Sequence, residues 1–180
     1  MSVAPAELRA PADLLRCYLA NLAALYEADG ALAARVEAVP FAALPALEAA
    51  RDGELTVHLR ADDGQPVYAH SRYAPLAEAR KLVEPPRQPR KAGEHAAGSA
   101  DAAAPEPPTD DLDAACFFVA GFGLGYVTVE VERRFVRPLI LVAEADLAVL
   151  KAGLCVTDVS QPLRERRLMF LTAADKAELH

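Results

Sequence analysis

The sequence lacks the features of exported, membrane-spanning and disulfide-bonded proteins. Its three cysteines, Cys17, Cys116 and Cys155, lie far apart in apolar runs and form no CxxC pair, which predicts reduced core residues in a cytoplasmic protein. The N-terminus has no cationic start followed by an apolar core. No apolar run approaches the length of about 18 residues that a membrane helix needs. We therefore expect an unexported protein that does not cross a membrane.

Basic charge and catalytic motifs are also scarce. The formal net charge is −7, and no basic patch spans a face, so nucleic acid is not an expected partner. His58 and His70 have no cysteine and no third histidine nearby, so we expect surface or hydrogen-bonded histidines and no metal. The serines Ser71, Ser99 and Ser160 lack the motif of an activated nucleophile. The sequence therefore names no catalytic residue.

The most informative stretch contains two apolar runs, 116–120 and 138–143, separated by a glycine-rich turn and followed by an acid. The glycines stand at alternate positions: Gly121, Gly123 and Gly125. The order strand, glycine turn, connector, strand, acid is typical of a nucleotide-binding βαβ unit. In such a unit the glycines let backbone approach a ligand, and the acid, here Glu144, bonds a ribose hydroxyl. These four residues are the predicted binding site.

Alternatives remain open for this stretch. Tyr126 stands where the strict G-x-G-x-x-G fingerprint has glycine or alanine, and G-x-G-x-G is more often met in adenosylmethionine-dependent methyltransferases. Residues 126–131 alternate apolar and polar side chains, so a β-hairpin through the glycines competes with a helix. Val127, Val131 and Phe135 share one helical face, and we expect the helix. A bound ligand would be a sugar nucleotide or adenosylmethionine.

The residues before this stretch predict a helical cap. A first helix opens at Pro11 and ends at Asp29-Gly30, and a second covers 31–39. The apolar stripe of the first helix is predicted to contain Leu15, Leu19, Leu22 and Tyr26. A third apolar face contains Phe41, Leu44 and Leu47. We expect two or three short helices packed as an antiparallel cap.

A β-hairpin and a further helix are predicted next. Apolar and polar residues alternate over 55–60, a turn follows, and apolar residues return over 67–70. Ser71 is expected to cap a helix over 74–83 that has a proline in its first turn. The residues of this helix that are available for burial are Leu76, Leu82 and Val83.

Residues 85–113 separate this part from the glycine-rich stretch. They are rich in proline and alanine and contain no large apolar side chain before residue 111, so they cannot bury enough surface to offset the entropy of ordering. We predict a disordered linker, inserted between a first segment at 1–84 and a second at 114–180.

A second crossover is predicted after Glu144. Asp146 is expected to cap a helix over 147–152. Gly153 fits the end of that helix, and Lys151 would interact favourably with its last turn.

The remaining residues predict a third strand at 168–171, preceded by a short helix that starts at Asp158. With two right-handed crossovers, the three parallel strands would take the order 3-2-1. The predicted fold class is α/β, a Rossmann-like βαβαβ unit with an N-terminal helical cap and a β-hairpin. Residues 172–175 have capping-box spacing, and we expect a fold that is incomplete at the C-terminus.

The segments HSRYAPLAEARKLVE, GFGLGY, ILVAEAD and DVSQPLRERR occur in this order. Together they resemble the N-terminal region of motility accessory factor (Maf) glycosyltransferases, bacterial proteins associated with attaching nonulosonic (sialic-acid-like) sugars to flagellin. The matching positions are His70-Ser71, Tyr73, Pro75, Glu78-Ala79, Gly121 to Tyr126, Glu144, Asp158 and Ser160. Tyr126, which departs from the dinucleotide fingerprint, is the residue that the Maf-like turn calls for.

The resemblance implies an N-terminal Rossmann-like accessory domain. Its partners would be a downstream catalytic domain or a separate subunit, and flagellin. The sequence has no counterpart of the family's larger central domain, to which sugar transfer is ascribed, so no catalytic residue is carried over. We expect a truncated or separately encoded domain that is not catalytic alone, although its parent protein would be a glycosyltransferase.

Two other functions stay open beside this one. The chain could be a methyltransferase-like nucleotide-binding module, or a non-catalytic interaction domain whose glycine turn only connects a strand to a helix. A three-stranded sheet without further neighbours leaves an open edge and an uncovered apolar face. We therefore expect the chain to form a homo-oligomer or to bind a partner.

Overall fold

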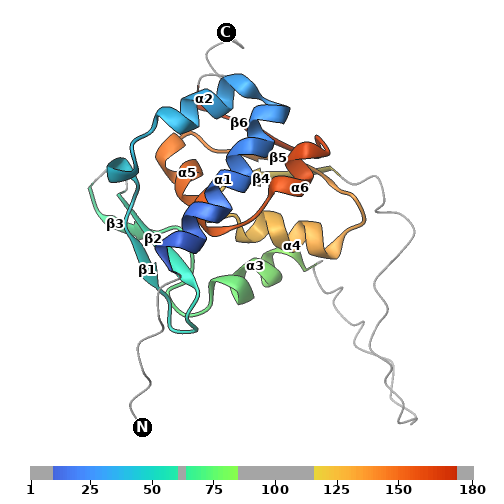
Figure 1. Cartoon of the computed structure of the whole chain (residues 1–180). Coiled ribbons are helices and arrows are strands. Elements are labelled where there is room, and N and C mark those ends of the chain that lie inside the picture. Colours follow the sequence, from blue (N-terminus) through green and yellow to red (C-terminus); the bar gives the residue numbers. More distant parts are fainter. Residues whose placement is uncertain (1–9, 61–63, 85–115, 174–180) are drawn as a thin grey trace, which may run out of the picture.

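A parallel sheet lies at the centre of the C-terminal part (Figure 1). The computed structural model describes residues 10–60, 64–84 and 116–173. The strands lie side by side in chain order: β4 (Cys116–Ala120), β5 (Leu139–Ala143) and β6 (Leu168–Leu171). Both pairs are parallel, which confirms the predicted α/β fold and its strand order.

Helices pack on one face of this sheet. α4 (Tyr126–Arg134) joins β4 to β5, which makes the hairpin alternative wrong. α5 (Leu147–Val156) and α6 (Ser160–Arg164) join β5 to β6. The sheet side chains beneath these helices are buried in one core: Val119, Ile140, Val142, Leu168 and Phe170. We call this side the covered face.

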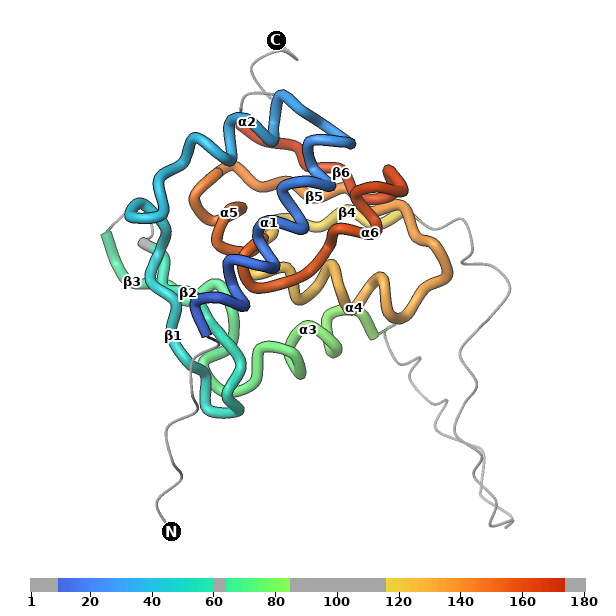
Figure 2. Tube along the Cα trace, viewed as in Figure 1, coloured from blue at the N-terminus to red at the C-terminus, as the bar shows by residue number. Residues whose placement is uncertain are grey.

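The N-terminal helices complete the same core. α1 (Pro11–Ala28) passes in front of the sheet and lies against α5 and α6, as the ribbon and the trace both show (Figures 1 and 2). Asp29 ends α1, and its carboxylate accepts from the Leu32 N–H to cap α2 (Gly30–Ala38). Residues on both sides of the predicted linker therefore share one core.

The predicted apolar stripe of α1 is wrong for three of its four residues. Leu15, Leu19 and Tyr26 are exposed, whereas the buried residues are Tyr18, Asn21, Leu22, Ala24 and Leu25. The hydrogen bonds of Asn21 explain which face of α1 is buried. Its amide donates to the Leu154 and Thr157 carbonyls at 2.7 and 2.8 Å, and its side-chain oxygen accepts from the Val159 N–H. A buried amide thus satisfies the end of α5.

A second, antiparallel sheet packs against α4 and α5, since its Leu55 and Val57 share a buried cluster with Tyr126, Ala152 and Val156. Its strands follow chain order: β1 (Leu47–Ala49), β2 (Leu55–Arg60) and β3 (Pro66–Tyr68). The pairing of β2 with β3 confirms the predicted hairpin. The predicted third helix shrinks to one turn, η1 (Phe41–Ala43), because Pro40 and Pro45 restrict the backbone on either side, and Leu47 belongs to β1.

α3 (Pro75–Val83) follows the hairpin and lies against α4. Pro75 and Ala79 are its buried residues, and Leu82 is exposed. The residue before the helix is Ala74, which makes no side-chain cap. The Ser71 hydroxyl instead accepts from the Tyr73 and Ala74 N–H groups. The predicted cap is therefore wrong, and the Ser71 hydroxyl bonds the turn that precedes the helix.

Two predictions about α5 are wrong. The helix continues past Gly153 to Val156, and a Cβ on Gly153 would lie 2.6 Å from the Phe122 ring and closer still to the Gly123 carbonyl. Glycine is needed there for close packing. Lys151 is buried, and its ammonium donates to the Glu37 and Val39 carbonyls. It therefore caps α2, not its own helix, and burial lowers its pKa.

Asp146 caps α5 as predicted, since its carboxylate accepts from the Ala148 N–H. The predicted linker at 85–113 and the end of the predicted helix after Thr172 lie outside the described residues, as does Ser99. Cys155 is buried and Cys17 half-buried, but Cys116 is exposed because it lies on the sheet face away from the helices. No helix in the described parts has the length and hydrophobicity to span a bilayer.

Candidate functional site

The glycine loop, residues 121–125, turns the chain from β4 into α4. Gly121, Gly123 and Gly125 have φ angles of 83°, 54° and 83°, a left-handed backbone that only glycine adopts without strain. The alternate spacing in the sequence therefore reflects the backbone geometry of the loop. Between the glycines, Phe122 and Leu124 are buried.

Each N–H group of the glycine loop has a partner within the protein. The Gly121 N–H donates to the Ala143 carbonyl, and the Gly125 N–H to the Phe122 carbonyl. The Phe122 N–H donates to the Glu144 carboxylate at 3.0 Å, and the Gly123 N–H to the same oxygen at 3.5 Å. A phosphate bound by these N–H groups would have to displace a protein partner.

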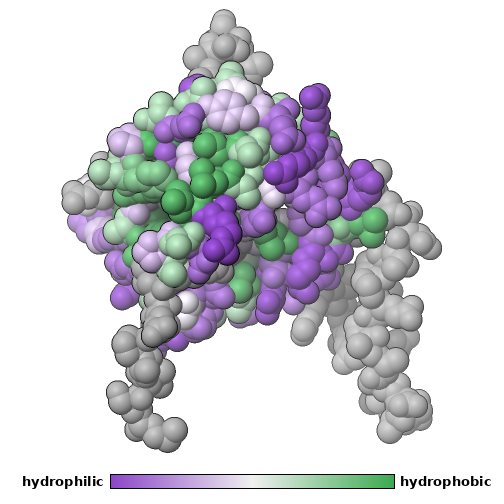
Figure 3. Space-filling view, viewed as in Figure 1, coloured by the Kyte–Doolittle hydropathy of each residue, from purple (hydrophilic) through white to green (hydrophobic). Residues whose placement is uncertain are grey.

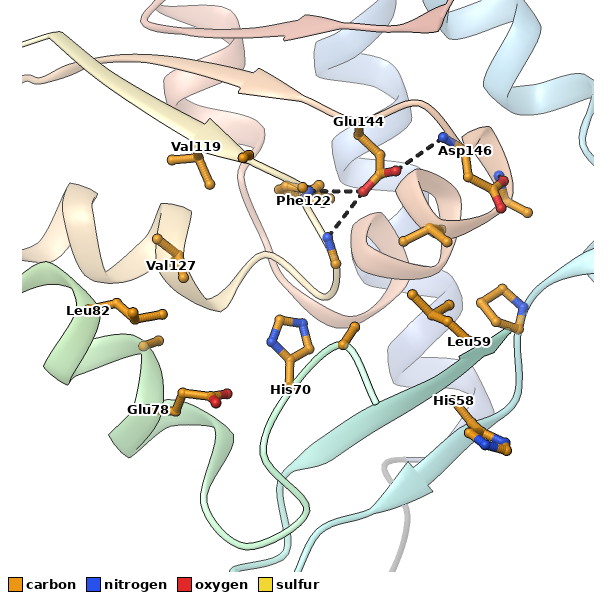
Figure 4. A pocket seen from close by; sticks show the side chains of 18 of the residues that line it. His58, Leu59, His70, Glu78, Leu82, Val119, Phe122, Val127, Glu144 and Asp146 are labelled. Carbon is orange, nitrogen blue, oxygen red and sulfur yellow. Dashed lines mark hydrogen bonds between the residues drawn. The ribbon is translucent and has the colours of Figure 1, made fainter. Parts of the chain in front are cut away.

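Glu144 braces the loop from one side (Figure 4). Its second carboxylate oxygen accepts from the Asp146 N–H at 3.1 Å. One carboxylate thus joins the end of β4 to the turn that begins α5. The sequence predicted Glu144 as a ribose ligand, and in the described structure its oxygens accept from backbone N–H groups.

His70 braces the loop from the opposite side (Figure 4). Its Nε2 accepts from the Leu124 N–H at 2.7 Å, so the ring is neutral and carries its proton on Nδ1. Burial lowers the pKa of His70, and the nearby Glu78 carboxylate partly opposes this. A Cβ on Gly123 would lie 2.5 Å from Nε2, so histidine and glycine fit each other closely.

Tyr126 joins the loop to the antiparallel sheet. Its hydroxyl donates to the Leu55 carbonyl at 2.9 Å and accepts from the Leu55 N–H at 3.2 Å. Its ring meets the His70 ring edge to face, with centroids 5.1 Å apart. Reasoning from motif spacing missed the roles of His70 and Tyr126, although both stand in the segments that carry the family resemblance.

A cleft of about 1060 Å³ opens at the carboxyl ends of β4 and β5, the edge at which α/β proteins bind ligands. The glycine loop, β2 and α3 supply its walls. Gly121, Gly123 and Glu144 line it, while Gly125 packs away from it against Phe122 and Thr157. The structure therefore brings three of the four predicted site residues to one cleft.

The charge of the cleft is negative. Three carboxylates line it, those of Glu78, Glu144 and Asp146, and no lysine or arginine of the described residues does. His58 is stacked on Tyr68, and both His58 and His70 border the cleft. The described parts hold no group of three or more metal-ligating side chains. An anionic ligand would meet repulsion here, and a cationic or uncharged ligand would not. The ligand roles of the glycines and Glu144 stay predictions.

A second, apolar groove lies on the face viewed in Figure 3, where hydrophobic residues gather over α1 and the chain that follows α2. Its volume is about 380 Å³. Leu14 and Leu15 from α1 line it together with Phe41 and Leu44. It has no polar group placed to orient a ligand, so the acidic cleft remains the candidate site.

The sequence matches no protein-family model and no curated protein. One solved structure, a Maf glycosyltransferase from Magnetospirillum magneticum AMB-1, matches with a TM-score of 0.57 and 18% sequence identity. The match covers 88% of this chain and 27% of that chain, so this chain spans about a quarter of that protein's length. The fold implied by the family resemblance is therefore confirmed.

Proposed function

We propose that this chain is a non-catalytic accessory domain of a Maf-type glycosyltransferase. In this role it acts in the cytoplasm beside a catalytic domain or subunit that transfers a nonulosonic sugar to flagellin. Its own task is to hold a rigid surface at the carboxyl edge of the parallel sheet, and a sugar nucleotide is bound by the catalytic partner.

The observation that carries this proposal is the convergence of the motif residues. His70, Glu144 and Tyr126 all bond the glycine loop or the strand beside it. In the same region the Ser71 N–H donates to the Glu78 carboxylate at 2.8 Å. Residues far apart in the sequence thus form one hydrogen-bonded assembly, which supports a structural purpose for the motifs. The shared fold with a Maf glycosyltransferase supports the family assignment.

The test is the mass of flagellin in the organism that makes this protein. Deleting the gene is expected to remove the nonulosonic sugar from flagellin, and the wild-type gene to restore it. Gly123→Val, which cannot form the loop beside His70, is expected to fail in this complementation. Gly30→Ala is the matched control, because no atom lies within 4 Å of its Cβ position. An unchanged flagellin mass after deletion would exclude the proposed function.

The negative cleft favours one alternative, a methyltransferase-like module. Adenosylmethionine carries a cationic sulfonium group, which three carboxylates would attract. Titration calorimetry of the chain with adenosylmethionine and with sugar nucleotides separates the two functions. The accessory function predicts no heat from either, and saturable heat from adenosylmethionine alone would establish the alternative.

A further inference from the structure

The sheet face opposite the helices is continuous and apolar. Parallel pairing places its residues in rows across the strands. The rows are Cys116 and Leu139, then Phe118, Leu141 and Met169, then Ala120, Ala143 and Leu171. No residue in these rows is polar or charged, and none belongs to a core cluster. We call this the open face.

The open face is exposed although its residues are of core type. Phe118 is 64% exposed and Met169 44%. Parallel sheets occur almost only with both faces covered, and large exposed apolar patches mark interaction sites. The strands bear the near-continuous apolar sequence of a sheet that is buried on both sides. A covering layer is therefore part of the working state of the protein.

The sheet also has an unpaired edge at β4. β4 pairs with β5 along one edge, and no strand of the described residues pairs with the other edge. An unpaired edge of this kind accepts a further strand. The free edge and the open face meet at β4.

The right-handedness of crossovers determines how one added unit could pair with the free edge of β4 and cover the open face. The chain steps from β4 to β5 to β6 in one direction. Because crossovers between parallel strands are right-handed, both place their helices on the same face of the sheet, the covered face. A helix that crosses the sheet from the β6 side and enters a parallel strand beside β4 steps in the opposite direction. The same right-handed rule then places this helix on the open face.

The size of the open face matches one helix. Three strands spaced about 4.8 Å apart, each of four or five residues, give a patch roughly 10 to 15 Å wide and about 15 Å long. A helix is about 10 Å across and rises 1.5 Å per residue, so roughly three turns cover it.

We propose that β4 and the open face dock a helix–strand unit of the catalytic partner, with its apolar helix against Phe118, Leu139 and Met169 and its strand beside β4. The identity of the partner rests on the proposed function, whereas the position of its helix rests on the sheet alone. In the matching Maf glycosyltransferase the shared fold occupies 27% of the chain. Most of that protein therefore lies outside the shared fold. A second copy of this chain offers a sheet face, not a helix.

Docking would also complete the candidate site. The strand order would reverse between β4 and the added strand, and α/β proteins bind ligands at such a switch point, beyond the carboxyl ends of the strands. Gly121 ends β4 at this point, and no atom lies within 4 Å of its Cβ position. The acidic cleft at this edge is thus expected to lie between the two chains or domains.

Photo-cross-linking tests the proposal in the cells that make the protein. A photoreactive phenylalanine derivative replaces Phe118, and mass spectrometry identifies the cross-linked residues. Tyr73 is the matched control, because it is aromatic and 61% exposed but lies before α3, where the Arg51 guanidinium stacks on its ring. We expect cross-links from position 118, and none of the same kind from position 73, to an apolar helix that is followed by a strand in a catalytic domain.

The other outcomes overturn the proposal. Cross-links to a second copy, to residues 85–115 or 174–180 of this chain, or to no protein at all would each exclude the docked unit. A helix in a protein unrelated to sugar transfer would keep the docking geometry and exclude the proposed function. Flagellin that loses its sugar on gene deletion, without cross-links at position 118, would keep the function and exclude the docking.

Discussion

The two faces of the parallel sheet carry the same kind of residue and have opposite surroundings. On β5, Ile140 is fully buried under the helices, while the adjacent Leu139 is 38% exposed on the open face. On β6, Phe170 is buried and Met169 exposed. Hydrophobicity along these strands therefore reflects two surfaces, one buried within the chain and one exposed, which we propose a partner covers.

The same contrast between the two faces applies to the surroundings of the glycine loop. The covered face is completed by close contacts at its carboxyl edge, where Gly153 and Gly123 let α5 and the loop approach each other. Glu144 and His70 then satisfy the loop N–H groups. The open face has no such fixed neighbour among the described residues. The loop N–H groups are thus satisfied within the chain, whereas the open face is the surface that we propose for a partner.

The largest expected effect on the free energy of unfolding is a difference between alanine variants of two neighbouring residues of β5. Ile140→Ala removes fully buried atoms and is expected to lower the free energy of unfolding by about 2–5 kcal/mol. Leu139→Ala on the open face is expected to change it by less than about 1 kcal/mol. Chemical denaturation of both variants measures the difference. Equal losses would mean that the open face is already packed in the isolated chain.

A smaller effect is expected where α5 meets the glycine loop. Gly153→Ala places a methyl group against the Phe122 ring and the Gly123 carbonyl, so overpacking is expected to cost about 1–3 kcal/mol. Gly30→Ala in α2 is the control, with open space around its Cβ position and an expected neutral or slightly stabilising effect. Thermal unfolding of the pair tests this, and a harmless Gly153→Ala would refute the close approach.

A smaller effect on stability, which depends on pH, is expected from His70. Burial lowers its pKa below the usual 6.5, so the folded state favours the neutral ring that accepts from Leu124. The stabilisation is fully present above pH 6.5 and decreases as the pH falls from there toward the lower folded pKa. His70→Gln keeps an acceptor without titrating, and its unfolding free energy between pH 7.5 and 5 should lack this contribution.

The smallest effect on stability is expected from modifying the open face chemically. Maleimide labelling should reach the exposed Cys116 first, with a change in unfolding free energy within about 0.5 kcal/mol. Cys155 should react much more slowly, because burial raises its pKa to about 11 and shields the thiol. Peptide mass spectrometry follows both sites. Faster labelling of Cys155 would reverse the assignment of the two faces.

The sequence was sufficient for features that depend on local pattern. Period, turn residues and crossovers predicted β4, β5, β6 and the hairpin, because alternation and apolar runs are fixed by neighbours in the chain. The buried face of α1 could not be predicted this way. Its orientation depends on Asn21, a polar residue whose backbone partners lie more than 130 residues away.

The sequence located the glycine loop of the candidate site but did not predict the hydrogen bonds that surround it. Glycine spacing and the acid after β5 located the loop and Glu144. His70, Tyr126 and Lys151 carry polar groups whose partners are backbone atoms of other elements. No sequence period encodes such contacts. The family resemblance did mark His70 and Tyr126, because it compares positions without needing to know what they touch.

Light scattering of the full chain over a range of concentrations tests the claim that the open face lacks a covering layer in the isolated chain. An unpartnered open face predicts a mass of 19.2 kDa at low concentration that rises without a plateau, and a Phe118→Glu variant that stays at that mass, while Leu19→Glu on α1 still associates. A wild-type chain that remains monomeric throughout, or that settles as a defined dimer, would contradict the claim.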